Sequence, residues 1–174
     1  MKMLALGTTA LAAIALMAGA AEAAPKEPGT PASAELISRA DATKAAQAAL
    51  ADCIARGQPA SVVILDAEGF QRAAFSDDGA KYIGLHTSAQ KAASVLAFGV
   101  STRELQARVA SDPHFAEQFG KDERYHFSPG GLPIYRKGKL VAIIAVGGAM
   151  GIDEECARAG LKALGWGSAS AAGE

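Results

Sequence analysis

Residues Leu140–Val146 have the sequence LVAIIAV, an unbroken apolar run that decides the fold of this chain. A run of this kind is typical of a strand that is buried on both faces of a sheet. The pair Lys137-Gly138 precedes it and forms a turn after a glycine-rich entry, Pro129–Tyr135, which leads into another strand. Because so short a turn joins strands that run antiparallel, this region predicts a β-hairpin within an antiparallel sheet.

A second hairpin is predicted earlier in the chain. Ser61–Leu65 is a β-branched apolar run, Asp66–Gly69 has the composition of a turn, and the chain returns through Phe70–Phe75. The polar stretch Ser76–Gly79 then ends the second strand of this hairpin. The chain therefore supplies two strand pairs to one sheet.

Helical segments surround the two hairpins. Apolar periodicity, capping residues and glycine stops predict four of them: 33–56 with Ser33 as N-cap, 85–98, a short helix from the Ser101–Glu104 capping box to about Ala110, and 152–164. Residues 113–128 are expected to form a long loop. The order is α-ββ-αα-ββ-α, which predicts an α/β (α+β) single domain, residues 33–165, with a central antiparallel sheet flanked by helices and a short tail at 166–174.

The first 23 residues have the pattern of a secretory signal peptide. Lys2 precedes an apolar run, Met3–Ala18, and Ala21-Glu22-Ala23 has the A-x-A form of a cleavage site. An uncleaved membrane anchor is the alternative, but the apolar run is marginal for a span. We expect residues 1–23 to be removed, residues 24–32 to form a proline-containing linker, and the mature chain to be periplasmic or secreted, with no membrane span.

Composition and charge exclude several classes of function. The 174 residues carry a net charge of −1 without a long cluster of Lys and Arg, so a nucleic-acid partner is not expected. The sequence lacks Gly-x-Ser-x-Gly, His-x-x-x-His and Cys-x-x-Cys-His motifs, which argues against a serine hydrolase, a simple zinc site and covalent haem. Cys53 and Cys156 either pair in an oxidising compartment or remain buried thiols.

Five short motifs follow one another in an order that resembles a known family. They are VILDAEG at 63–69, QKAA at 90–93, STREL at 101–105, GGLPI at 130–134, and VGG at 146–148 followed by DEECARAG at 153–160. Together they resemble the GlcG/HbpS family of haem-binding proteins, which also forms the C-terminal part of PduO-type proteins. The resemblance covers residues 34–165 and implies a central antiparallel sheet, assembly into homo-oligomers and non-covalent binding of haem b. This chain differs at 75–78, where Phe-Ser-Asp-Asp replaces the Arg-Met-Asp-like segment that is usual in the family.

Haem iron without covalent attachment would need a His, Met, Cys or Tyr ligand. The chain has three histidines, His86, His114 and His126. His86 is favoured as an iron ligand by its position at a helix start and within the family, and His126 by its aromatic neighbours Tyr125 and Phe127. The alternative for each is an ordinary surface or core histidine.

Other residues of the motifs are candidates for contacts with an anionic ligand. Lys91 and Arg103 are candidate partners of haem propionates, although a lysine on a partly apolar helix face more often extends to solvent. Gly130 and Gly131 either form a tight turn or present backbone N–H groups to an anion. Thr102 is either part of a helix start or, as the resemblance implies, a haem contact.

The favoured function is an exported haem-binding protein that traps, stores or senses haem without catalysis. A binding module for a small anionic metabolite, such as an organic acid, is the alternative, and an enzyme acting on haem or a small carboxylate is a weaker one. We expect the site near the start of the helix 85–98, with residues 113–131 as one wall. A homo-oligomer is expected from the resemblance and from the small side chains of the Ala-rich terminal helices.

Overall fold

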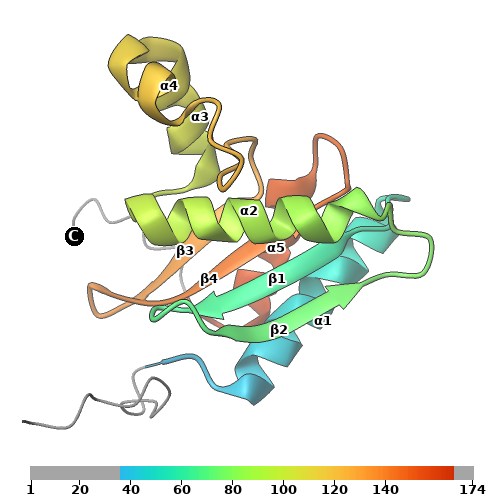
Figure 1. Ribbon diagram of the computed structural model, residues 1–174. Helices are drawn as coiled ribbons and strands as arrows, with labels where there is room; N and C mark the ends of the chain where they lie inside the picture. The colour runs from blue at the N-terminus through green and yellow to red at the C-terminus, as the bar shows by residue number, and fades with distance from the viewer. Residues whose placement is uncertain (1–35, 167–174) are drawn as a thin grey trace, which may run out of the picture. The chain divides into compact units, whose positions relative to one another are not determined.

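Four antiparallel strands form one sheet in the order β2-β1-β4-β3 (Figure 1). The computed structural model describes residues 36–166, so the predicted signal peptide, the linker and residues 167–174 lie outside the described residues. The strands are β1 (Ser61–Asp66), β2 (Gln71–Ser76), β3 (Gly131–Arg136) and β4 (Lys139–Gly147). Both predicted hairpins are confirmed, and the apolar run that forms β4 is central and buried from Val141 to Gly147.

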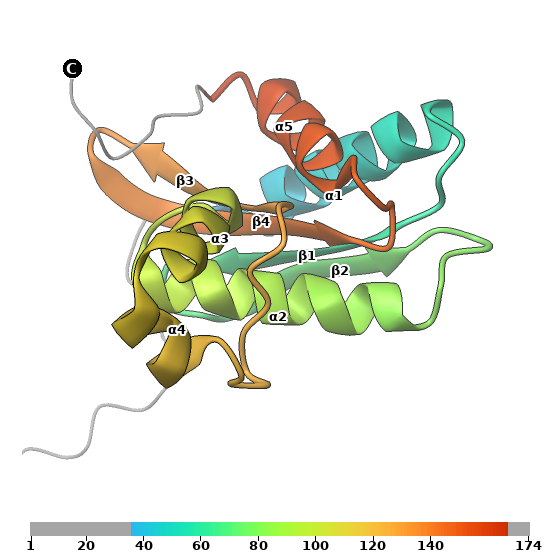
Figure 2. The same ribbon diagram turned by 90° about the horizontal axis from the view of Figure 1, so that it is seen from above.

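Residues 36–166 also form five helices. They are α1 (Arg39–Ala55), α2 (Ile83–Phe98), α3 (Thr102–Ser111), α4 (Pro113–Phe119) and α5 (Asp153–Ala163). Of these, α4 packs against α3 and not against the sheet. Figure 2 shows α1 and α5 on one face of the sheet and α2 on the other. The predicted fold class, a single mixed α/β domain with a central antiparallel sheet, is confirmed.

Two predictions of local structure need correction: the start of the first helix and the loop at 113–128. The first helix begins at Arg39, later than predicted, and its N-cap is Ser38, whose hydroxyl accepts from the Asp41 N–H; Ser33 lies outside the described residues. The region predicted as a loop contains α4, because Asp112 ends α3 and also caps the next helix by accepting from the Phe115 N–H. Pro113 then occupies the first turn, where a missing N–H costs nothing.

The face covered by α1 and α5 holds the larger core. Most of the α1 side chains in this core are small, with Ala42, Ala45 and Ala49 fully buried. Gly160 of α5 lies so close to α1 that an added Cβ would be 2.6 Å from the Ala45 carbonyl oxygen. These small side chains are thus used inside the chain, which removes the packing argument for a homo-oligomer.

Cys53 of α1 and Cys156 of α5 form a disulfide, with their Cα atoms 5.4 Å apart. Both cysteines are fully buried, so the bond lies inside the core between the two helices and the sheet. Of the two alternatives that the sequence left open, the structure has the paired cysteines.

Candidate functional site

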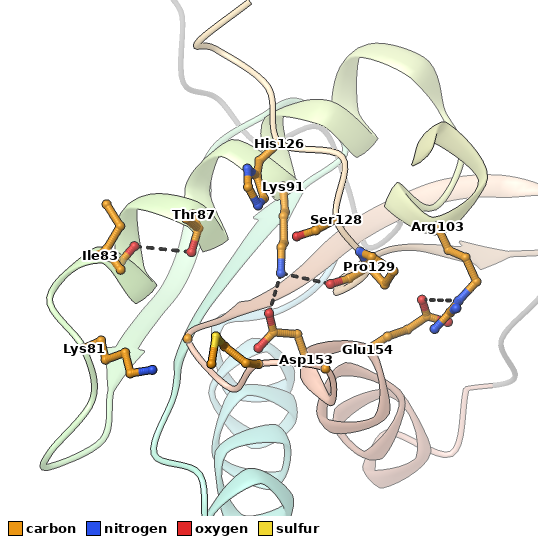
Figure 3. Close-up of a pocket in the computed structure, with 13 residues that line it drawn as sticks. Lys81, Ile83, Thr87, Lys91, Arg103, His126, Ser128, Pro129, Asp153 and Glu154 are labelled. Atoms are coloured by element: carbon orange, nitrogen blue, oxygen red, sulfur yellow. Dashed lines mark hydrogen bonds and ion pairs between the residues drawn. The ribbon is translucent and has the colours of Figure 1, made fainter. Parts of the chain in front are cut away.

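A cavity of about 460 Å³ lies beside α2 (Figure 3). Four segments form it: the first half of α2 with the residues just before it, the start of α3, the stretch between α4 and β3, and the turn between β4 and α5 with the first residues of α5. Ile83, Thr87 and Lys91 face it from α2, because residues four apart share one side of a helix. The other lining residues are Lys81, Arg103, His126, Ser128, Pro129, Gly148, Met150, Gly151, Asp153 and Glu154.

Lys91 forms the floor of the cavity. Its side chain is 1% exposed, and its ammonium donates to the Pro129 carbonyl at 2.9 Å, to the Val146 carbonyl at 3.0 Å and to the Asp153 carboxylate. Burial lowers the pKa of Lys91 and raises the pKa of Asp153, while the pair opposes both shifts. Lys91 therefore does not extend to solvent, and all three of its donors are engaged by the chain itself.

Gly130 and Gly131 let the chain pass close to this lysine. A Cβ on Gly130, whose φ is +137°, would lie 2.8 Å from the Lys91 ammonium nitrogen. The Gly131 N–H donates to the Thr102 hydroxyl at 2.9 Å. Thr102 and both glycines are buried and do not line the cavity. Their observed role is to pack β3 against α2 and α3.

His126 is the histidine that lines the cavity. Its side chain is half-buried, and burial lowers its pKa below 6.5, with the Lys91 charge acting in the same direction. Its backbone N–H donates to the Ser94 hydroxyl of α2 at 2.9 Å. His86 is exposed on α2, outside the lining, and His114 is exposed on α4.

An aromatic cluster fixes the segment that carries His126. The ring of Phe98, at the end of α2, contacts four other rings at centroid distances of 5.1–6.0 Å: Phe115, Phe119, Tyr125 and Phe127. Because Tyr125 and Phe127 flank His126, their packing holds the histidine over α2. In the second half of residues 113–131, the segment expected to form one wall of the site, His126, Ser128 and Pro129 line the cavity.

Two arginines share a buried carboxylate at the rim. Glu154 is 3% exposed and accepts from Arg103 Nε at 2.8 Å and from Arg158. Arg103 lines the cavity and is 56% exposed, whereas Arg158 does not line it. Sequence reasoning named Arg103 but missed Glu154, Asp153, Met150 and Lys81. The two acids lie in the first turn of α5, where the helix dipole alone explains a carboxylate, and nothing local marked the other two.

The part of the chain that the structure describes holds no group of three or more His, Cys, Asp and Glu side chains arranged to bind a metal ion. Within residues 36–166, no helix is both long and apolar enough to cross a membrane.

The fold and the cavity together define a small α/β domain whose cavity is lined by one histidine, by the rim cations Lys81 and Arg103, and by apolar side chains of Ile83, Pro129 and Met150. The family model described as "Haem degrading protein HbpS-like" matches residues 37–162, and the chain belongs to this family. No sequence among the curated proteins matches.

Several solved structures share the fold. A crystal structure of HbpS is 31% identical, with a TM-score of 0.68, over 82% of this chain and 99% of that one. A double mutant of HbpS from Streptomyces reticuli is also 31% identical, with a TM-score of 0.68, over 83% of this chain and 97% of that one. A PduOC:Heme complex is 21% identical, with a TM-score of 0.70, over 78% of this chain and 99% of that one, and at this identity it supports the fold alone.

Proposed function

We propose that this chain binds haem b non-covalently in the cavity beside α2. The family description names haem, and the relative at 31% identity, HbpS, belongs to the same family. The observation in this chain that carries the proposal is His126, a half-buried imidazole in a cavity that also has an apolar margin and two rim cations.

The lining residues fit the chemical parts of haem. His126 offers a ring nitrogen to the iron, and its lowered pKa keeps the imidazole neutral, which is the form that binds a metal. Ile83, Pro129 and Met150 offer apolar contact to the macrocycle. Arg103 and Lys81 offer positive charge to the propionates. Bound haem would supply an iron centre able to exchange electrons or bind a small gas molecule.

The other candidates from the sequence have weaker positions. Lys91 has no donor left for a propionate, since two carbonyls and Asp153 engage its ammonium. His86 is exposed and outside the lining, although its charge acts on His126. Thr102 and Gly131 bond to one another.

Hemin titration of the purified protein tests the proposal. We expect a shifted Soret band that saturates at stoichiometric hemin in the wild-type protein and in His86→Ala and His114→Ala. His126→Ala should lose the shift or bind much more weakly, with circular dichroism showing that it folds. A flat wild-type titration would contradict haem binding, and equal binding by all three variants would contradict the assignment of His126.

A second function, haem degradation, is favoured by the family description itself. We propose binding without catalysis, as a trap, store or sensor. Incubating the hemin complex with oxygen and a reductant distinguishes the two. A stable Soret band supports simple binding, and its loss with release of a green, iron-free tetrapyrrole supports degradation.

Binding of a small organic anion remains the alternative of a different class, and the specific observation for it is the pair of rim cations Arg103 and Lys81. Saturable binding of simple carboxylates by calorimetry, together with a flat hemin titration, would favour it.

Export and self-association are also part of the proposal. The leader-like pattern of residues 1–23 supports a periplasmic or secreted protein, as does the disulfide, a bond typical of oxidising compartments. Membership of the family supports a homo-oligomer. N-terminal sequencing of the exported protein and light scattering test these two statements.

A further inference from the structure

We propose that Met150 provides the second axial ligand of the iron, opposite His126, so that the bound haem is six-coordinate with one nitrogen and one sulfur ligand. This inference rests on the proposed haem site and adds its second protein ligand. Three observations carry it: where Met150 lies, how it is displayed, and which other lining groups can bind iron.

Met150 is an apolar residue whose side chain is exposed to solvent at the cavity. It is the single methionine among residues 36–166, it lines the cavity together with His126, and its side chain is 75% exposed. Core methionines fill gaps between other side chains, so this exposure is not explained by packing within the chain. The side chain is available to a ligand in the cavity.

The backbone around Met150 is fixed although the side chain is exposed. Its carbonyl accepts from Gln58 Nε2 at 3.4 Å, and the N–H of the preceding residue, Ala149, donates to Asp153 Oδ1 at 2.8 Å. Ala149 itself is fully buried. The turn between β4 and α5 therefore presents the thioether from an anchored backbone, as a preorganised ligand requires.

The other polar side chains of the lining are engaged or unsuited to iron. Lys91 has no free lone pair as a cation, and Asp153 and Glu154 are held in ion pairs. Thr87 donates its hydroxyl to the carbonyls of its own helix. Lys81 and Arg103 are cations, and the hydroxyl of Ser128 is not among the usual protein ligands of haem iron. An imidazole and a thioether remain, which together form a common ligand pair of haem iron.

The two ligands come from separate segments of the chain. His126 belongs to the stretch between α4 and β3, on the α2 side of the Lys91 ammonium in Figure 3. Asp153 approaches the same ammonium from the other side, and Met150 stands three residues before Asp153 in the turn. Histidine and methionine are thus supplied to the lining by different segments of the chain.

A thioether ligand would have a measurable effect on the iron. Methionine ligation raises the reduction potential of haem relative to ligation by nitrogen alone. The bound haem would accordingly favour the ferrous state more than a haem held by His126 and water. It would also show the weak far-red absorption band that ferric haem has when a thioether sulfur is bound.

Absorption spectra and potentiometry of hemin complexes test this assignment. The wild-type protein should give a low-spin ferric spectrum with the far-red band. Met150→Leu keeps an apolar side chain of similar size without the sulfur, so it should lose the band, become high-spin and have a lower midpoint potential. Met150→His should remain low-spin without the band.

Ile83→Ala is the matched control. Ile83 also lines the cavity and is 41% exposed, so this variant removes apolar contact without removing a ligand. It should bind hemin somewhat more weakly and keep the far-red band. A wild-type complex without the band, or an unchanged spectrum and potential in Met150→Leu, would overturn the assignment while haem binding stands. The absence of any hemin complex would overturn both.

Discussion

Helices α1 and α2 cover opposite faces of the same sheet but bury different kinds of side chain. The buried positions of α1 are all apolar, four of them alanines, and they end at the disulfide. The buried positions of α2 include Ser88, Lys91 and Ser94. The first helix is thus built for close packing, whereas the second carries polar groups that need individual partners.

Each buried polar group of α2 has such a partner. Ser88 donates to the carbonyls of Gly84 and Ser61, and Ser94 donates to the carbonyl of Gln90. Buried polar groups cost free energy unless they are hydrogen-bonded, and even then an apolar core is often more stable. From this comparison we infer that packing on the α1 face contributes most to the free energy of unfolding. The buried polar groups on the α2 face contribute less, and one of them lines the cavity.

The largest expected effect concerns the α1 face. Replacing both cysteines, Cys53→Ala with Cys156→Ala, opens a loop whose ends are 103 residues apart in sequence. For a loop of that length the chain-entropy model gives a loss of about 4–5 kcal/mol in the free energy of unfolding. Urea denaturation measures the loss.

If the two faces have separate roles, the folded double alanine variant should bind hemin within about twofold of the wild-type affinity. A large loss of affinity at unchanged stability would break the comparison.

The next largest effect concerns the floor of the cavity. Lys91→Met leaves the carboxylate of Asp153, which is only 12% exposed, without its cation and removes a donor from two carbonyls, which should cost about 3 kcal/mol of stability at neutral pH. Adding Asp153→Asn removes the unpaired charge and keeps the acceptor for the Ala149 N–H, so the double variant should recover much of the loss. Urea denaturation of both variants decides the point, and a double variant less stable than Lys91→Met would contradict it.

The sequence was sufficient for the sheet because both hairpins are local. Each strand pair is joined by a short turn, so the antiparallel pairing follows from neighbouring residues. The sequence did not predict helix α4 because Asp112-Pro113 is compatible both with the end of a helix and with the start of one. In the structure Asp112 ends α3 and caps α4. The local pattern could not show that both apply.

The cavity was less predictable because its contacts are long-range. Lys91 and Arg103 were candidates from the sequence, but Asp153 is 62 residues from Lys91, and Glu154 is 51 residues from Arg103. Because the helix dipole already explains a carboxylate in a first helical turn, there was no reason in the sequence to predict these two ion pairs. The disulfide, between residues 103 apart, stayed open for the same reason.

A smaller effect distinguishes the two arginines that bind Glu154, because one of them lines the cavity and the other does not. Arg103 and Arg158 both bind Glu154 and are similarly exposed, at 56% and 53%, but Arg103 alone lines the cavity. Arg103→Gln should weaken hemin binding about tenfold through loss of a charged hydrogen bond, and Arg158→Gln should leave it unchanged. Each should cost about 1 kcal/mol of stability, because the arginine removed is exposed and the buried Glu154 keeps the other arginine as its partner. Equal hemin affinities in the two variants would contradict the role of Arg103.

The smallest effect is the titration of His126 in the ligand-free protein. Burial and the Lys91 charge lower its pKa below 6.5, so the imidazole should take up its proton at a lower pH in the folded chain than in the unfolded chain. Between these two pKa values the unfolded chain binds more protons, and stability therefore falls as the pH drops below 6.5. A proton-NMR titration of the imidazole, assigned with His126→Gln, should have its midpoint below 6.5.

Hemin binding should follow the same titration if His126 is the nitrogen ligand, because a proton and iron compete for the imidazole. Affinity should be nearly constant above pH 6.5 and fall only below the lowered pKa. In His126→Gln the remaining weak binding should lack this step, since the competing proton site is gone. A His126 midpoint above 6.5 would mean that Asp153 outweighs burial and Lys91 at this histidine, and the α2 face would then hold a cationic histidine unsuited to iron.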